Sequence, residues 1–165
     1  MSKKAGGAKK SGAKARTTSV IARNARAYHD YDVLDELMCG IVLTGSEIKS
    51  IRNGKVSMNE AFAKIVNGEL MLHGLYVAPY QEASYNNHDP HRIRKLLATR
   101  QEINRLQAKT QEKGLALIPL KLFFNRAWVK VNLGLCKGKK LYDKRDDIKQ
   151  RDAKRDIERT MKTHR

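Results

Sequence analysis

The sequence predicts a mainly β protein in which about six antiparallel strands close into a small barrel, the OB type among the candidates, with two or three flanking helices. Three observations lead to this prediction. Strand-like segments separated by turn residues fill residues 28–136. The chain shows neither the strand–helix alternation that builds a parallel sheet nor an internal repeat. A strand-rich region of this length favours a barrel, because closing a sheet removes its exposed edges.

The first part of this region predicts two strands and a short helix. Alternating apolar residues from Tyr31 to Leu37 indicate one strand, and 40–43 indicate a second, with Cys39-Gly40 at a bend. Thr44 offers a helix start. Asn53-Gly54 ends this helix after about two turns, because glycine tolerates the left-handed conformation at a helix C-terminus.

Two hairpins and a longer helix follow. Asn67-Gly68 is typical of a tight hairpin turn, since both residues tolerate positive φ angles. Asn125-Arg126 indicates a second hairpin. Between the two, Thr99 and Glu102 form a capping box, which predicts a helix over 100–113. The predicted strand pairs are 61–66 with 69–77 and 115–124 with 127–135.

The distribution of charge divides the chain into three parts. Residues 1–27 contain eight basic and no acidic side chains and almost nothing to bury, which predicts a disordered basic arm. Residues 28–136 carry a net charge of only +3 and form the barrel. Residues 137–165 hold twelve basic and six acidic side chains, interleaved at helical spacing. They predict a tail that is disordered alone and becomes helical against an anionic surface.

The total charge of +17 implies a polyanionic partner. No apolar run approaches the roughly 20 residues needed to cross a bilayer, and no apolar segment follows the basic start as a secretory signal requires. These observations favour a nucleic acid over a membrane. Two cysteines, Cys39 and Cys136, are too few for a disulfide framework, and we expect both to be small buried residues in a reducing cytoplasm.

No enzyme signature is present, so we expect no catalytic residue, no bound metal and no cofactor. One segment, 86–91, places two imidazoles and a carboxylate together, which is compatible with a metal site or a general base. The favoured interpretation is a turn at Asp89-Pro90 whose histidines donate to phosphate or backbone. No further ligand or nucleophile accompanies them.

A basic run leads out of the long loop predicted over 79–93. Pro90 and Leu96-Leu97 hold this loop at both ends, so its basic side chains are expected in a fixed geometry suited to phosphates and unpaired bases. Lys49 and Arg52, on the short helix, are weaker candidates for RNA contact. The basic run comprises His88, Arg92, Arg94 and Lys95.

Three motifs identify a family resemblance. They are Gly45-x-Glu47-Ile48-Lys49-Ser50-Ile51-Arg52-x-Gly54-Lys55, His88-Asp89-Pro90-x-Arg92-x-Arg94-Lys95-Leu96-Leu97 and Gly138-Lys139-Lys140-x-x-Asp143-Lys144-Arg145. In this order, and over the chain from about Ala25 to the C-terminus, they closely resemble the SsrA-binding protein family, also called small protein B.

The resemblance implies an OB-type barrel that binds transfer-messenger RNA and, with it, rescues stalled bacterial ribosomes by trans-translation. The body is expected to bind the tRNA-like part of the RNA. The tail is expected to enter the empty message channel beyond the decoding centre and to fold there as a helix. We expect the free chain to be a monomer.

The matched motifs also imply site residues. RNA-binding candidates are Lys49, Arg52, His88, Arg92, Arg94, Lys95 and Leu97. Ribosome-binding candidates in the tail are Lys139, Lys140, Tyr142, Asp143, Lys144 and Arg145. Tyr142 lies among charged residues with no core to fill, which is typical of an aromatic that stacks on a base. Met38 and Thr99 depart from residues that relatives use for RNA, so those two contacts are not carried over.

Two other functions fit parts of the same pattern. A structural ribosomal protein is also small, basic and tailed, and it is the main alternative. An RNA-processing hydrolase that uses His88 and Asp89 is disfavoured, because no nucleophile or metal ligand set supports it.

Overall fold

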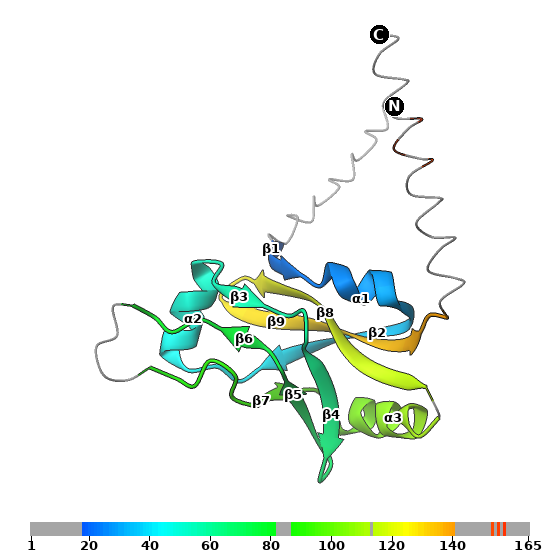
Figure 1. The fold of residues 1–165 in the computed structure, drawn as a ribbon. Helices are drawn as coiled ribbons and strands as arrows, with labels where there is room; N and C mark the ends of the chain where they lie inside the picture. The colour runs from blue at the N-terminus through cyan, green and yellow to red at the C-terminus, as the bar shows by residue number, and fades with distance from the viewer. Residues whose placement is uncertain are drawn as a thin grey trace, which may run out of the picture.

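The computed structural model describes residues 18–81, 87–112 and 114–140, together with residues 153, 155 and 157. Within these residues, six strands form a closed antiparallel ring in the order β8, β4, β5, β7, β2, β9, and the pairing of β8 with β9 closes it (Figure 1). The predicted barrel is therefore confirmed. The ring strands are β2 (Tyr31–Ile41), β4 (Phe62–Val66), β5 (Glu69–His73), β7 (Arg94–Leu97), β8 (Leu115–Asn125) and β9 (Trp128–Gly138).

Short strands and helices flank the ring. β1 (Thr18–Arg23) pairs with β8, and β3 (Val56–Ser57) pairs with β6 (Tyr76–Val77). Figure 1 shows α2 beside β6 at one side of the molecule, and α3 next to one end of β8 at the opposite side. The helices are α1 (Ala25–Asp30), α2 (Gly45–Arg52) and α3 (Arg100–Thr110).

Alternating side chains of the ring fill its interior. Val129, Val131 and Leu133 of β9 are buried, as the alternation along this strand predicts. Leu70 and Leu72 of β5 are fully buried as well. The inner face of the barrel is therefore the core, and the residues between these positions point outward.

The two cysteines are free and buried, as expected. Burial raises the pKa of Cys39 to about 12 and that of Cys136 to about 11. Both thiols are therefore protonated at neutral pH and pack as small apolar residues.

The turn and cap signals of the sequence are confirmed. Asn67 and Gly68 adopt φ angles of 50° and 73° between β4 and β5, and Arg126 adopts 58° between β8 and β9. Thr99 caps α3 through a reciprocal pair of hydrogen bonds with Glu102. This helix ends at Thr110, before the predicted end at 113.

The predicted bend at Cys39-Gly40 is wrong, because 31–41 forms one continuous strand. Gly40 lies opposite Leu97 of β7 on one side and Lys130 of β9 on the other. A Cβ atom at Gly40 would lie 3.2 Å from the Cβ atom of Leu97. The glycine therefore permits the close approach of a neighbouring strand and does not mark a turn.

Residues 18–27, which the composition assigned to a disordered arm, belong to the ordered body. β1 extends the edge of β8, and α1 follows it. The buried Asn24 side chain accepts a hydrogen bond from the Ala27 amide and donates to the carbonyls of Met58 and Pro119. Backbone pairing and the buried amide of Asn24 stabilise this segment. The prediction of disorder rested on its low apolar content, and neither of these interactions depends on apolar content.

At the other end, β9 continues to Gly138 and so includes the first residues assigned to the tail. The arm over 1–17 and the tail over 141–152 lie outside the described residues. Of the tail beyond them, Ala153, Arg155 and Ile157 are described and are helical. No helix in the described part of the chain is long and apolar enough to cross a membrane.

Candidate nucleic-acid interface

The outward side chains of five neighbouring strands of the ring, β4, β5, β7, β2 and β9, form a surface that curves around the barrel, and we call it the outer sheet face. Residues directly opposite each other in antiparallel strands project to the same side, so the register decides which residues belong. Phe62 of β4 lies opposite His73 of β5, and Lys64 lies opposite Met71. Met71 lies opposite Lys95 of β7 on its other side. Three strands thus contribute to one surface.

The same register continues across β2 and β9. Leu97 projects to the outward side of β7 and lies opposite Gly40. Gly40 lies opposite Lys130 of β9, and Met38 lies opposite Asn132. The outer sheet face consists of Glu36, Met38, Gly40, Phe62, Lys64, Val66, Glu69, Met71, His73, Lys95, Leu97, Lys130 and Asn132.

Exposed apolar and charged side chains are mixed on this face, and its two carboxylates, Glu36 and Glu69, accept from Asn132 and Lys95. Met38 is 54% exposed and Leu97 is 52% exposed, although both are large apolar side chains. Lys64 and Lys95 are exposed beside them, and Lys130 is half-buried. An apolar surface interspersed with lysines fits a partner that has both phosphates and apolar base faces. The face is therefore a candidate interface for RNA.

Lys95 and Leu97, two of the predicted RNA-binding residues, lie on this face. The Lys95 ammonium forms an ion pair with Glu69, and both side chains are about half exposed. An exposed ion pair contributes little to stability, because water and salt screen it. A phosphate can therefore replace the Glu69 carboxylate at small cost.

Arg92 and Arg94 converge instead on Glu47, a buried residue of α2. Arg94 Nε donates to Glu47 Oε1 at 2.8 Å, and Arg94 Nη1 donates to the Leu75 carbonyl oxygen at 2.6 Å. Arg92 Nη2 donates to Glu47 Oε2 at 2.5 Å, and the Arg92 side chain is 28% exposed. The Arg94 side chain has no exposed surface, which contradicts the prediction of a direct RNA contact there.

The charge of Glu47 is maintained by its donors. Burial raises the pKa of this carboxyl group, but hydrogen bonds from Arg92 and the Thr44 amide, together with Arg94, outweigh burial and lower the pKa to about 2. Thr44 N donates to Glu47 Oε2 at 2.7 Å. One carboxylate therefore joins the start of α2 to the segment that leads into β7.

The histidine-rich segment forms the turn that the sequence favoured. Asp89 Oδ1 accepts from the His91 amide at 2.9 Å. His88 Nδ1 lies 3.1 Å from Ser46 Oγ, and His88 Nε2 lies 3.0 Å from the Val77 carbonyl oxygen. His88 thus fixes the loop to α2 and β6. Within the described ranges, no group of three or more His, Cys, Asp or Glu residues is arranged to hold a metal ion.

Lys49 and Arg52 project from the exposed side of α2. The Lys49 ammonium lies 5.1 Å from the centroid of the Tyr80 ring. Because α2 lies beside β6, these cations are not on the strands that carry Lys95 and Leu97 (Figure 1). They form a second basic surface outside the outer sheet face.

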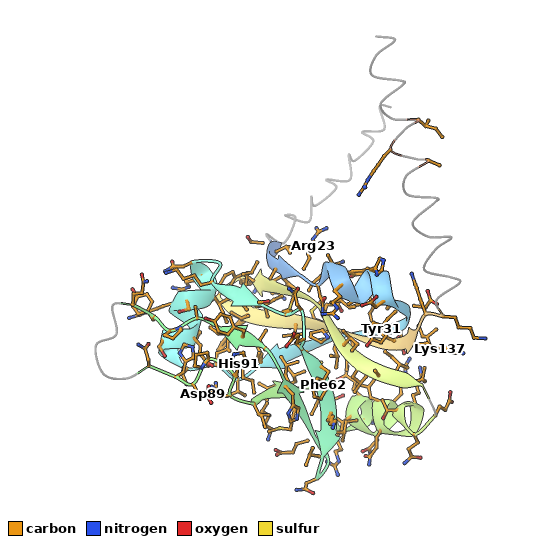
Figure 2. All side chains as sticks on the ribbon, in the orientation of Figure 1. Arg23, Tyr31, Phe62, Asp89, His91 and Lys137 are labelled. Atoms are coloured by element: carbon orange, nitrogen blue, oxygen red, sulfur yellow. The ribbon has the colours of Figure 1, made fainter. Side chains whose placement is uncertain are left out.

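The start of the tail is attached to the body through Lys139. Its amide donates to the Asp30 carbonyl oxygen at 2.9 Å, and its ammonium donates to the Tyr28 carbonyl oxygen at 3.3 Å. The Lys139 side chain is only 9% exposed. Figure 2 shows Tyr31 and Lys137 near each other at this end, where β2 begins and β9 ends. Lys140 follows and is exposed.

The remaining predicted tail residues lie outside the described residues. They are Tyr142, Asp143, Lys144 and Arg145.

Sequence reasoning missed the larger part of the outer sheet face. The alternation along β9 placed Lys130 on the side opposite Val131, but only the register shows that Lys130 lies next to Gly40. The role of Glu47 was also missed, although a glutamate three residues after Thr44 is the signal of a capping box. Of the two departing positions, Met38 lies on the face, whereas Thr99 caps α3.

Comparisons with known proteins agree with the resemblance found in the motifs. The family model "SmpB protein" matches residues 21–163. An SsrA-binding protein of Syntrophobacter fumaroxidans is 52% identical over 151 residues, which cover 92% of this chain and 94% of the relative. One of Desulfitobacterium hafniense is 54% identical over 140 residues, covering 85% of this chain and 90% of the relative.

A solved structure is similar as well. It is described as "tmRNA-SmpB: a journey to the center of the bacterial ribosome" and matches with a TM-score of 0.63 and 50% sequence identity. The match covers 73% of this chain and 85% of the other.

Proposed function

This chain belongs to the SmpB protein family, and we infer that it binds transfer-messenger RNA and acts with it on the bacterial ribosome. Its relatives are named for binding SsrA, the transfer-messenger RNA, and the similar solved structure concerns tmRNA and SmpB in the ribosome. The chain thus functions in trans-translation, the rescue of stalled ribosomes. Binding is the whole of this function, and the proposal includes no chemical step.

On this chain's own residues, one observation supports the RNA-binding role above the others. The register places Lys64, Lys95 and Lys130 on one face together with exposed Met38 and Leu97. Lysine contacts with phosphates provide affinity that falls as the salt concentration rises, whereas the affinity from apolar contacts with bases does not depend on salt. We assign the primary RNA contact to the outer sheet face.

We assign the ribosome contact to the tail. Its basic and acidic residues are interleaved at helical spacing. Because β9 ends at Gly138 and Lys139 is bonded to the body, a helix over 140–165 would extend roughly 39 Å, at about 1.5 Å per residue. That length suits the message channel beyond the decoding centre. The anchored Lys139 fixes where this helix leaves the body. In this division the body selects the RNA and the tail engages the ribosome.

Lys49 and Arg52 of α2 remain candidates for a further contact with RNA or ribosome, and Arg92 and His88 act by holding the loop between them. A ribosomal partner implies action in the bacterial cytoplasm. We propose that the free chain is a monomer.

The function is tested by capturing the full chain from a bacterial lysate and sequencing the RNA that it retains. One dominant stable RNA, the transfer-messenger RNA, is the expected result. Sedimentation of the lysate distinguishes the alternative of a structural ribosomal protein. Such a protein would accompany every ribosome, whereas this chain is expected in substoichiometric amounts that depend on its RNA. A broad mixture of captured RNAs would contradict the proposal.

A further inference from the structure

Two aromatic rings stack on each other at the β4–β5 end of the outer sheet face. The Phe62 and His73 rings are nearly parallel, with 7° between their planes and 5.2 Å between their centroids. They come from directly opposite positions on β4 and β5. Figure 2 labels Phe62 on β4.

Phe62 is exposed despite its apolar ring. It retains 37% of its accessible surface, and the Lys64 ammonium lies 5.5 Å from the ring centroid. A lysine over an aromatic ring forms a cation–π contact that is weak at an exposed site. The same lysine can therefore move to a phosphate and leave the ring surface to another group.

The imidazole of His73 stacks on the Phe62 ring. Its Nε2 atom is buried and has no hydrogen-bond partner among the described residues. Leaving a buried polar atom unpaired costs stability, and a phenylalanine at this position would avoid that cost. No hydrogen bond between Nε2 and a described residue orients the His73 ring, and the contact that the structure shows for it is the stacking on Phe62.

We propose that Phe62, supported by His73, is a stacking site for one unpaired base of the bound RNA. This proposal rests on the assignment of RNA binding to the outer sheet face and extends that face to β4. The chemistry is consistent, because every base has an apolar face that stacks on an aromatic ring, and Lys64 lies next to the ring to receive the adjoining phosphate. His73 acts as a positioning residue through Phe62.

Phe62 and Lys130 mark the two ends of the face. Along the face they are separated by three strands, β5, β7 and β2. Because no strand carries both, they should contact different nucleotides, and their contributions to affinity should be independent.

The test measures the affinity of the full chain for transfer-messenger RNA at several salt concentrations. Phe62→Leu keeps an apolar side chain but removes the aromatic face, and it should weaken binding about tenfold, the contribution of one stacked base. The slope of log affinity against log salt should not change, because stacking releases no counterions. Phe62→Tyr should retain the affinity. His73→Phe should also retain it, whereas His73→Ala should weaken it.

Two matched variants complete the design. Val20→Ala changes an exposed apolar residue of β1, outside the outer sheet face, and should leave the affinity unchanged. Lys130→Ala tests the proposed interface itself and should lower both the affinity and the salt slope. Circular dichroism and thermal unfolding of each variant establish that it is folded, and Phe62→Tyr supplies the comparison if Phe62→Leu is destabilised.

The outcomes separate the two claims. If Phe62→Leu binds as tightly as the parent chain while Lys130→Ala is weakened, the stacking site is wrong and the outer sheet face stands. If neither variant is weakened, the outer sheet face is wrong as well. An equal loss in Phe62→Leu and Phe62→Tyr would also overturn the stacking site, since the aromatic face is then not what the RNA requires.

Discussion

Glu47 and Arg94 form an ion pair with no solvent exposure on either side chain, in which Arg94 Nε donates to Glu47 Oε1 at 2.8 Å. The pair joins the start of α2 to the first residue of β7, and Arg92 adds a second guanidinium to the same carboxylate. A basic motif that suggested a surface for phosphate thus contains one arginine that is wholly internal. Its role is to position the strand whose next residues, Lys95 and Leu97, lie on the outer sheet face.

Replacing Glu47 with glutamine should destabilise the fold by about 3–5 kcal/mol, the usual cost of removing one partner from a buried ion pair. The loss arises because Arg94 remains buried without a carboxylate. Urea unfolding followed by circular dichroism measures it. Lys49→Ala, an exposed change on the same helix, should alter stability by less than about 0.5 kcal/mol. Equal stability of Glu47→Gln and the parent chain would refute the structural role of the pair.

The free energy of unfolding should fall in acid, because Glu47 becomes protonated. Its pKa is lowered to about 2 in the folded chain, against about 4.3 for a glutamate in an unfolded chain. The unfolded chain therefore binds a proton more readily, and the contribution of Glu47 is complete above about pH 4.3 and disappears as the pH falls toward 2. The contribution is on the order of 3 kcal/mol.

Urea unfolding of the parent chain and of Glu47→Gln across this pH range measures the effect. The difference in unfolding free energy between the two chains should shrink as the pH is lowered from 5 to 2. A constant difference over that range would show that the pKa of the Glu47 carboxyl does not differ in this way between the folded and the unfolded chain.

Arg94 and Lys95, which are adjacent in the second motif, should differ in how they affect RNA binding. Lys95→Ala should weaken binding to transfer-messenger RNA and reduce the slope of log affinity against log salt by roughly one, the value for one lost phosphate contact. Arg94→Met, which keeps the length of a buried side chain, should not change that slope while the chain is folded. Fluorescence anisotropy over a salt series measures both.

Arg23→Ala is the matched control for these measurements. It removes an exposed cation from β1, which lies outside the outer sheet face. A reduced slope for Arg94→Met and an unchanged slope for Lys95→Ala would reverse the assignment of the two residues.

Thr99 should matter for stability and not for RNA affinity. Its hydroxyl accepts from the Glu102 amide at 3.3 Å, and the Glu102 carboxylate accepts from the Thr99 amide at 2.8 Å. Thr99→Ala removes the cap and should cost about 1 kcal/mol in unfolding free energy. Thr99→Ser keeps a capping hydroxyl and should cost less. A weaker affinity for RNA in both folded variants would indicate instead that Thr99 contacts the ligand.

Local signals allowed the sequence to predict much of this fold. Asn67-Gly68 and Thr99 act within a few residues of themselves, and each has the predicted role. The bend predicted at Gly40 is wrong because the need for a glycine there comes from the close approach of Leu97, a residue of another strand. The ordered segment at Asn24 was missed for the same reason, since its partners are the carbonyl groups of distant loops and strands.

The candidate site was less predictable than the fold. The motifs identified Lys95 and Leu97, but they also included the buried Arg94. Charge along the chain does not reveal whether a side chain points inward or outward. Phe62 and Lys130 belong to no basic run, and they join the site only through the register of five strands. A surface assembled across strands becomes visible once their pairing is known.

The most direct test of the division between body and tail compares the full chain with a chain that ends at Lys140. Affinity for transfer-messenger RNA and rescue of stalled ribosomes in reconstituted bacterial translation are measured for both, with Lys130→Ala in the full chain as the reciprocal variant. We predict that the shortened chain binds the RNA as tightly as the full chain and fails in rescue, while Lys130→Ala binds the RNA more weakly. Loss of RNA binding in the shortened chain, or rescue without the tail, would contradict the account.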